Sequence, residues 1–347
     1  MLAEVSVVDG MTWRQLIAEP LSSQVQPLKV QLDKGARTLR ITPWAGWMHD
    51  LRILGGDWLP VGPGGQVLLE QMVHSPELFL PKSRHLNVND GRVELADLPV
   101  RDFNEDVILL GGSPNYYHWL IDNLPRLLHI KPHIGRERLL VPENLLPFQR
   151  RTLELLGYGA DRLIFVGNHE CVRASRVLVP SLLAMSTFPH PDVVKMLRRW
   201  FLFKRHPDKP FRRVFVSRAD AQSRRLVNED ALWPILSSHG FERVVLGQMS
   251  FDEQVRLFAE VDVLLAVHGA GMTNMVFMPP KSRVIEIACA QHPATFFTHL
   301  ALVSARPYRA ISAEAVTVGE GGNPLGGDWS LNPDVLEQTL AQLGRLE

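Results

Sequence analysis

Only two cysteines, Cys171 and Cys289, occur among the 347 residues of the chain. Two thiols cannot build a disulfide framework or a four-cysteine zinc site, so the small disulfide-rich and zinc-finger classes are excluded. Net charge is also missing, because 37 Lys and Arg residues balance 37 Asp and Glu residues. The overall charge therefore gives no reason to expect nucleic acid as a partner.

Long hydrophobic runs are absent as well. No stretch approaches the roughly 20 apolar residues that cross a bilayer, and the first residues lack the basic-then-apolar pattern of a signal peptide. We therefore expect a cytoplasmic protein with reduced thiols, and any membrane association to be peripheral, at the inner membrane face. His118, His129 and His133 have no cysteine or carboxylate cluster beside them, so no metal and no other cofactor is expected.

The length and the 46% hydrophobic content favour two globular domains. In residues 1–100, short apolar runs alternate with Gly and Pro and predict a β-rich segment; the runs are Leu28–Leu32, Thr38–Ile41 and Gln66–Leu69. Strands and helices then alternate, which is typical of a parallel sheet with helices on its faces. Strands are predicted at 107–110, 138–141, 163–166 and 176–179, and helices at 115–130, 148–156 and 191–204.

The segment His206–Pro210 is predicted to be a linker and hinge, after which the alternation restarts. Strands are expected at 213–216, 243–246, 263–267 and 283–288, helices at 228–238, 250–260 and 333–346, and a loop at 313–330. This pattern predicts an N-terminal lobe over residues 1–205, which includes the β-rich segment. A Rossmann-like lobe follows over 206–312, and a loop with a C-terminal helix over 313–347.

A glycine-rich turn follows the predicted buried strand at 263–267 and reads His268-Gly269-Ala270-Gly271. Ligands of parallel α/β sheets lie beyond the carboxyl ends of the strands, and glycines let the backbone approach them closely. The N–H groups at the start of the following helix suit a diphosphate. The turn therefore indicates a nucleotide site, with a tight structural turn as the alternative.

A polar loop follows the strand at 213–216 and carries Ser217, Arg218, Arg224 and Arg225. Guanidinium groups hold phosphate oxygens in bidentate fashion and keep their charge when partly dehydrated. In an ordinary sheet this loop would end one strand from the glycine turn. The two features together favour a phosphate site over a solvated basic loop.

His118 and Asp122 lie four residues apart within the predicted helix at 115–130, which Asn115 is expected to cap and Pro125 to kink. Either group could accept a proton from a hydroxyl, and a core histidine beside a solvated aspartate is the alternative. Glu286 lies inside a predicted strand, where a charge needs a partner. A ligand hydroxyl and an arginine are the two candidate partners.

These motifs together resemble glycosyltransferase family 61. The resemblance is carried by V-S-R-x(6)-R-x-V-N-E, by H-G-A-G-M-T-N-M-V-F-M-P-P, by V-I-E-I and by the upstream N-Y-Y-H-W-L-I-D, and it extends from about Val107 to Ile287. It implies an α/β fold of GT-B type, with two Rossmann-like lobes facing a cleft. Because the chain lacks the membrane anchor or signal of the plant and animal members, it is more similar to bacterial members of capsule or lipopolysaccharide synthesis.

The resemblance also implies roles for single residues. The predicted donor-binding residues are Ser217, Arg218, Arg225, Asn228, His268, Gly269, Ala270, Gly271, Thr273, Asn274 and Glu286. Among these, the first three would hold the diphosphate, the turn residues would surround phosphate and ribose, and Glu286 would contact ribose or base. Asp122 is the preferred catalytic base with His118 as the orienting residue, and the reverse assignment stays open.

The implied activity is inverting, metal-independent transfer of a sugar from a nucleotide-diphosphate donor, a UDP-sugar, to a glycan or glycolipid acceptor in polysaccharide biosynthesis. Without a metal, Arg218 and Arg225 would stabilise the charge on the leaving diphosphate. Two alternatives remain at this point. One is another nucleotide-sugar enzyme such as an epimerase, and the other is a non-catalytic scaffold that binds sugar nucleotides or glycans.

Overall fold

The computed structural model describes residues 3–8, 19–21, 26, 28–31, 38–68, 83–89, 92–185, 188–203, 206–291 and 295–343. These residues divide into two compact units, Met1–Met196 and Leu197–Glu347. The division falls inside helix α6 (Pro191–Phe201), ahead of the boundary at 205/206 that the sequence predicted. No helix within the described ranges is long and apolar enough to cross a membrane.

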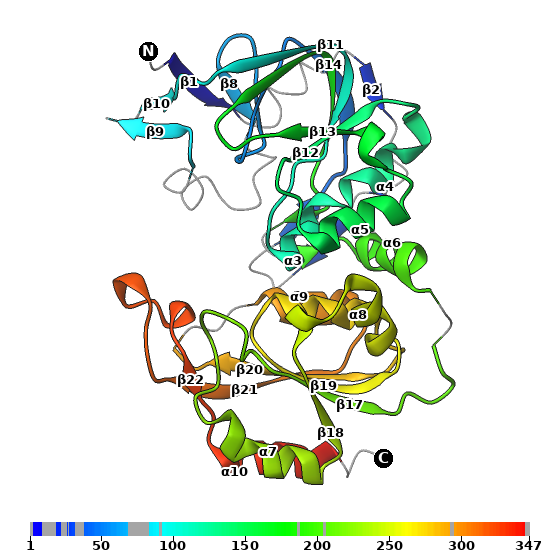
Figure 1. Cartoon of the computed structure of the whole chain (residues 1–347), viewed down its shortest axis with the longest axis vertical. Coiled ribbons are helices and arrows are strands. Elements are labelled where there is room, and N and C mark those ends of the chain that lie inside the picture. Colours follow the sequence, from blue (N-terminus) through cyan, green and yellow to red (C-terminus); the bar gives the residue numbers. More distant parts are fainter. Residues whose placement is uncertain are drawn as a thin grey trace. The chain divides into compact units, whose positions relative to one another are not determined.

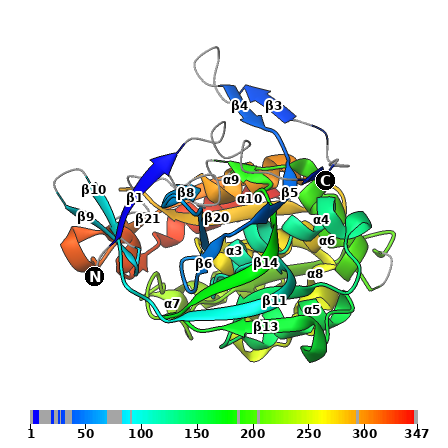
Figure 2. The ribbon, with the colours of Figure 1, turned by 90° about the horizontal axis from the view of Figure 1, so that it is seen from above.

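The first unit contains a mixed sheet. Its strands are β1 (Ala3–Val8), β2 (Glu19–Leu21), β5 (Ala45–His49), β6 (Arg52–Leu54), β7 (Leu59–Val61), β8 (Gln66–Leu68), β9 (Leu86–Asn89), β10 (Arg92–Leu95), β11 (Val100–Leu109), β12 (Arg138–Pro142), β13 (Leu163–Val166) and β14 (Cys171–Pro180). Strands β3 (Leu28–Gln31) and β4 (Thr38–Ile41) pair as a separate hairpin (Figure 2), and β15 (Ala184–Met185) pairs with β16 (Phe188–Pro189). The predicted β-rich segment is thus confirmed where the structure describes it; Leu32 and Leu69 lie outside the described residues.

Four parallel strands, in the order β13-β12-β11-β14, form the part of this sheet that the sequence predicted as alternating strands and helices. Their apolar residues, such as Val107, Leu140 and Val177, are fully buried. The helical elements of this unit are α3 (Tyr116–His118), η3 (Trp119–Asn123), α4 (Arg126–Ile130), η4 (Lys131–His133), α5 (Pro147–Leu155), η5 (Ala160–Arg162) and the first part of α6.

The second unit is built on a parallel sheet with one antiparallel edge strand. The strand order is β18-β17-β19-β20-β21-β22, from β17 (Arg212–Val216), β18 (Phe241–Val244), β19 (Val261–Val267), β20 (Arg283–Cys289), β21 (Tyr308–Ala315) and β22 (Trp329–Ser330). Numbered along the chain, the parallel strands follow the order 2-1-3-4-5 of flavodoxin-like doubly wound folds. The order therefore reverses between β17 and β19, which is where such folds bind their ligands.

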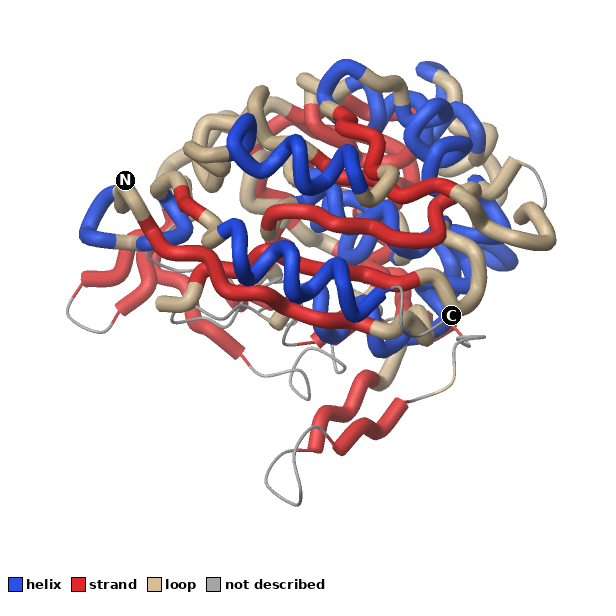
Figure 3. Tube along the Cα trace, turned by 90° about the horizontal axis from the view of Figure 1, so that it is seen from below, coloured by secondary structure: helices blue, strands red, loops and turns tan. Residues whose placement is uncertain are grey.

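Helices cover both faces of this second sheet (Figures 1 and 3). Helices α7 (Glu229–Ser238) and α10 (Pro333–Leu343) lie on one face, where Leu232, Leu236, Leu336 and Leu340 pack on the strands. On the other face lie α8 (Phe251–Phe258), α9 (Phe296–Val303) and the 3-10 helix η7 (Ala270–Phe277). Short 3-10 turns complete the unit: η6 (Leu246–Gln248), η8 (Glu320–Gly322) and η9 (Pro324–Gly326).

Several predicted element ends require correction. Asn228 does not cap α7 with its side chain, because its amide bonds to the backbone of Leu331 instead. Helix α9 and strand β21 were not predicted, and 313–330 is not all loop, since it includes the end of β21 and β22. Residues 313–343 form part of the second unit, because α10 packs into its core. Lys204 and 344–346, which the sequence assigned to helices, lie outside the described residues.

Candidate functional site

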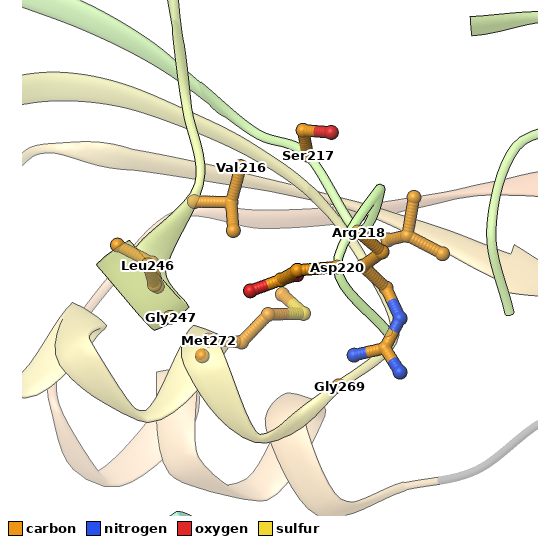
Figure 4. Close-up of a pocket in the computed structure, with 10 residues that line it drawn as sticks. Val216, Ser217, Arg218, Asp220, Leu246, Gly247, Gly269 and Met272 are labelled. Carbon is orange, nitrogen blue, oxygen red and sulfur yellow. The ribbon is translucent and has the colours of Figure 1, made fainter. Parts of the chain in front are cut away.

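A pocket opens in the second unit where β17, β18 and β19 reach their carboxyl ends (Figure 4). Its volume is about 160 Å³, and its lining comprises Val216, Ser217, Arg218, Asp220, Leu246, Gly247, Val267, Gly269, Gly271 and Met272. Two of these strands, β17 and β19, are the pair between which the strand order reverses. The pocket thus lies at the topological switch point, the usual position of a nucleotide or cofactor site in this class of sheet.

Arg218 is the cationic side chain of the pocket. Its Nε and Nη2 donate to the carbonyl of Ser223 at 3.3 and 2.9 Å, and Nη1 lies directly over Gly269 (Figure 4). A methyl group at Gly269 would clash with Nη1, so a side chain at this position would displace the end of the guanidinium. Burial lowers the pKa of Arg218 to about 10, which leaves the group charged at neutral pH.

Two further pairs of pocket residues are in contact with each other. Asp220 places its carboxylate against Gly247 (Figure 4). Leu246 packs against Gly271. Neither Asp220 nor Gly247 was predicted from the sequence. Gly247 follows a predicted strand of the parallel sheet, so its position at a carboxyl end is the signal that could have identified it.

Ser217 lines the pocket but already uses its hydroxyl. Its Oγ donates to the carboxylate of Glu229 at 2.8 and 2.9 Å and accepts the N–H of Ala219 at 3.1 Å. Since Glu229 opens α7, the hydroxyl ties the end of β17 to the start of that helix. Ser217 therefore shapes the loop that carries Arg218.

Glu286 is fully buried in β20, and both of its oxygens have partners. One oxygen bonds to His268 Nδ1, and the other accepts the hydroxyl of Tyr308. Burial and this carboxylate together raise the pKa of the tyrosine. The protein partners of Glu286 thus include no arginine among the described residues. The sequence did not anticipate Tyr308, because it comes from the unpredicted strand β21.

The structure brings only some of the predicted donor residues to the pocket, namely Ser217, Arg218, Gly269 and Gly271. Asn274 is buried and donates to Gln254 Oε1 at 2.9 Å, and Thr273 is likewise fully buried. Ala270 starts η7, and Arg225 and Asn228 bond to Asp328 and Leu331, respectively. Among the described residues, those lining this pocket do not include Arg225, Asn228, His268, Ala270, Thr273, Asn274 or Glu286.

In the first unit, His118 and Asp122 form the predicted pair. His118 Nδ1 lies 2.6 Å from Asp122 Oδ2, and the side chains are 20% and 4% exposed. The Asn115 side chain accepts the N–H groups of Tyr117 and His118, which confirms the predicted cap. The next turn is the π-helix η3, and Pro125 precedes α4, so the helix is divided at the proline as predicted.

Asp122 is buried, together with two groups that interact with its charge, Arg126 and Tyr117. Arg126 is 1% exposed, and burial lowers its pKa to about 10 against the opposing effect of Asp122. Burial and Asp122 also raise the pKa of Tyr117. An imidazole fixed by a buried carboxylate, with the ring more exposed than the carboxylate, can accept a proton from a bound hydroxyl.

The second unit is thus a doubly wound α/β unit with Arg218 in a pocket at its switch point, and the first unit contains the His118–Asp122 pair. Residues 116–285, which include both features, match the sequence model of the family described as Glycosyltransferase 61. The match supports the family that the motifs resemble.

Two curated relatives have names that agree with this match. The chain is 27% identical over 126 residues to the EGF domain-specific O-linked N-acetylglucosamine transferase of Drosophila melanogaster, covering 35% of the chain and 24% of that protein. It is 36% identical over 70 residues to the Alpha-1,3-arabinosyltransferase XAT3 of Oryza sativa subsp. japonica, covering 19% and 12%. The chain thus aligns with less than a quarter of the length of each relative, and these likenesses support glycosyl transfer.

Proposed function

We propose that this protein is an inverting glycosyltransferase that moves a sugar from a nucleotide-diphosphate donor, a UDP-sugar, to a glycan or glycolipid acceptor in polysaccharide biosynthesis. The observation that carries the proposal is the pocket at the switch point of the second sheet, where Arg218 lies over Gly269. A fixed cation beside the start of η7 suits a diphosphate, because helix N-terminal N–H groups and guanidinium groups both stabilise phosphate charge.

In the proposed reaction, His118 removes the proton of the acceptor hydroxyl while that oxygen attacks the anomeric carbon. The bond from the anomeric carbon to the diphosphate oxygen breaks with its electron pair, and the nucleoside diphosphate leaves with Arg218 stabilising its charge. His118 is favoured as the base over Asp122 because its side chain is 20% exposed and that of Asp122 is 4% exposed. With Nδ1–H donated to the carboxylate, the lone pair of the imidazole lies on Nε2.

The proposal includes a GT-B arrangement in which the His118–Asp122 pair belongs to the acceptor lobe and the pocket to the donor lobe. The relatives' names indicate two sugars to try first, N-acetylglucosamine and arabinose. Their nucleotide conjugates are therefore the first donors in the test below.

The experiment measures nucleoside diphosphate release from UDP-linked sugars, with and without glycan acceptors, by the wild type and by Arg218→Gln and His118→Asn. Removing one stabilising donor of the leaving group should reduce turnover about a hundredfold. The His118 variant should lose turnover while its affinity for UDP stays near that of the wild type. Both variants should unfold at temperatures close to the wild type.

Three outcomes would count against the proposal. If Arg218→Gln turned over at the wild-type rate, the diphosphate would not bind in this pocket. If the protein bound the donor but released no nucleotide with any acceptor tested, a non-catalytic scaffold would be favoured. If it isomerised the nucleotide sugar in the absence of acceptor, an epimerase would be favoured.

A further inference from the structure

The loop between β17 and α7 carries three arginines, Arg218, Arg224 and Arg225, whose surroundings differ. The resemblance assigned phosphate contact to Arg225. Its guanidinium, however, donates to Asp328 Oδ2 from Nε and Nη2 at 3.0 and 2.6 Å, and its backbone N–H donates to Oδ1 at 3.0 Å. This pairing raises the pKa of Arg225 and lowers that of Asp328, and it leaves the arginine side chain 52% exposed.

The same ion pair belongs to a larger connection between the loop and strand β22. The N–H of Val227 donates to the carbonyl of Trp329, and the N–H of Trp329 donates to the carbonyl of Arg225. Leu226 forms a parallel bridge with Trp329 and is buried. Arg225 therefore lies where the loop joins β22, and the carboxylate of Asp328 compensates its charge.

Arg224 has the opposite environment. Its backbone lies in the left-handed region at φ 59°, and its N–H donates to the carbonyl of Gly327. Its Nε is buried and has no hydrogen-bond partner among the described residues, and burial lowers the pKa of its guanidinium. A left-handed arginine with an unmatched buried donor is costly, and such features are concentrated at functional sites.

Arg224 does not line the pocket, but it directly follows Ser223, whose carbonyl accepts the hydrogen bonds of Arg218. The charge of Arg224 lowers the pKa of Arg218, while Asp220 and Asp328 oppose that effect through space. The contacts of Arg218 in this loop are to the carbonyl of Ser223, which carries no net charge. Two partly buried like charges repel each other, and an anion bound between them removes the repulsion and supplies acceptors for their N–H groups.

We propose that Arg218 and Arg224 form a phosphate clamp at the edge of the pocket, and that the Arg225–Asp328 pair joins the loop to β22 without contacting the ligand. This inference rests on the proposed function for the identity of the ligand, a nucleoside diphosphate, but it makes a separate claim about which neighbouring arginine binds it. The adjacent residues Arg224 and Arg225 thereby have different roles: Arg224 binds the ligand, and Arg225 connects the loop to β22.

The test compares two matched variants, Arg224→Gln and Arg225→Gln, in the full chain by isothermal titration with UDP, inorganic pyrophosphate and uridine. Loss of a charge-assisted contact should weaken UDP and pyrophosphate binding about tenfold or more in Arg224→Gln. Arg225→Gln should keep its affinity within about twofold and instead lower the melting temperature, because it loses the ion pair with Asp328. Arg224→Lys, which keeps the charge, should recover part of the lost affinity.

The reverse pattern, with Arg225→Gln weakened and Arg224→Gln unchanged, would overturn the assignment. So would a wild type that binds neither UDP nor pyrophosphate. If Arg224→Gln unfolds, Arg224→Lys and the salt dependence of pyrophosphate binding by the wild type decide the question, since a clamp of two cations must weaken steeply with salt. Intact pyrophosphate binding with this arginine pattern, but no sugar transfer from any donor, would refute the proposed function and leave the clamp standing.

Discussion

At the scale of the residue, His129 is a buried group whose neutral form the fold requires. It is 0% exposed, and its burial lowers the pKa to about 4, far below the ordinary value of 6.5. The unfolded chain therefore takes up a proton between pH 6.5 and 4 that the folded chain does not. The stability that this histidine contributes is complete above pH 6.5 and is lost as the pH falls toward 4.

We predict that lowering the pH from 7.5 to 5.5 costs the wild type about 1 kcal/mol more than it costs His129→Gln, whose side chain does not titrate. Urea unfolding at both pH values measures this difference. Burial also lowers the pKa values of His190 and His206, so a residual pH dependence in the variant is expected. Identical pH dependence in the two proteins would contradict the buried neutral state of His129.

Local spacing decided which residue pairs could be anticipated. His118 and Asp122 are separated by one helical turn, so their contact follows from the helix and was predicted. Arg225 and Asp328 are separated by 103 residues and meet only because β22 joins the sheet beside the loop. The contact of Asn228 could not be anticipated for the same reason, since its amide bonds to the backbone of Leu331, which is equally distant in the chain.

At the scale of the element, Gly269 in the turn from β19 into η7 affects the position of Arg218. The Gly269 φ of 173° is extended backbone that any residue adopts, so the turn itself does not require glycine. The effect comes from Arg218, whose Nη1 occupies the space that a side chain at Gly269 would take. The start of η7 and Arg218 of the neighbouring loop are thus in close contact.

We predict that Gly269→Ala displaces the guanidinium of Arg218 and weakens UDP binding about tenfold with little change in melting temperature. The matched control is Gly240→Ala, where φ is +73° and a Cβ would meet nothing within 4 Å. That variant should lose about 1 kcal/mol of stability through backbone strain and keep its affinity for UDP. Equal UDP affinity in Gly269→Ala and the wild type would show that Arg218 does not hold the ligand.

Elements with strong local signals were predicted well. The helices expected at 228–238 and 250–260 are α7 and α8, and β13 has the bounds 163–166 that its apolar run indicated. Strand β21 was missed because, of its buried residues Ile311 and Ala313, only the first is a large apolar side chain, so its hydrophobic signal is weak. Its presence matters for the site, since it supplies Tyr308 to Glu286.

At the scale of the whole molecule, the charge that develops on the leaving diphosphate must be compensated by groups of the protein or by a metal. Arg218 is charged at neutral pH and lies in the pocket, and the sequence contains no D-x-D pair that would carry a metal diphosphate. We predict that sugar transfer continues in the presence of EDTA at a rate near that of the untreated enzyme. Complete loss in EDTA, reversed by Mn²⁺, would show that the reaction depends on a metal.

The sequence by itself determined the alternation of strands and helices, the glycine turn after β19, the basic loop after β17 and the His118–Asp122 pair. Each of these depends on residues close together in the chain, whose spacing sets which side chains share a face or a strand end. The tertiary structure decided which arginine is compensated, Arg225 by Asp328, and which has a buried unpartnered Nε, Arg224, and it gave Glu286 its partners. Those outcomes depend on the order of the strands in the sheet, because hydrogen bonds and burial between distant segments exist only once the strands are assembled.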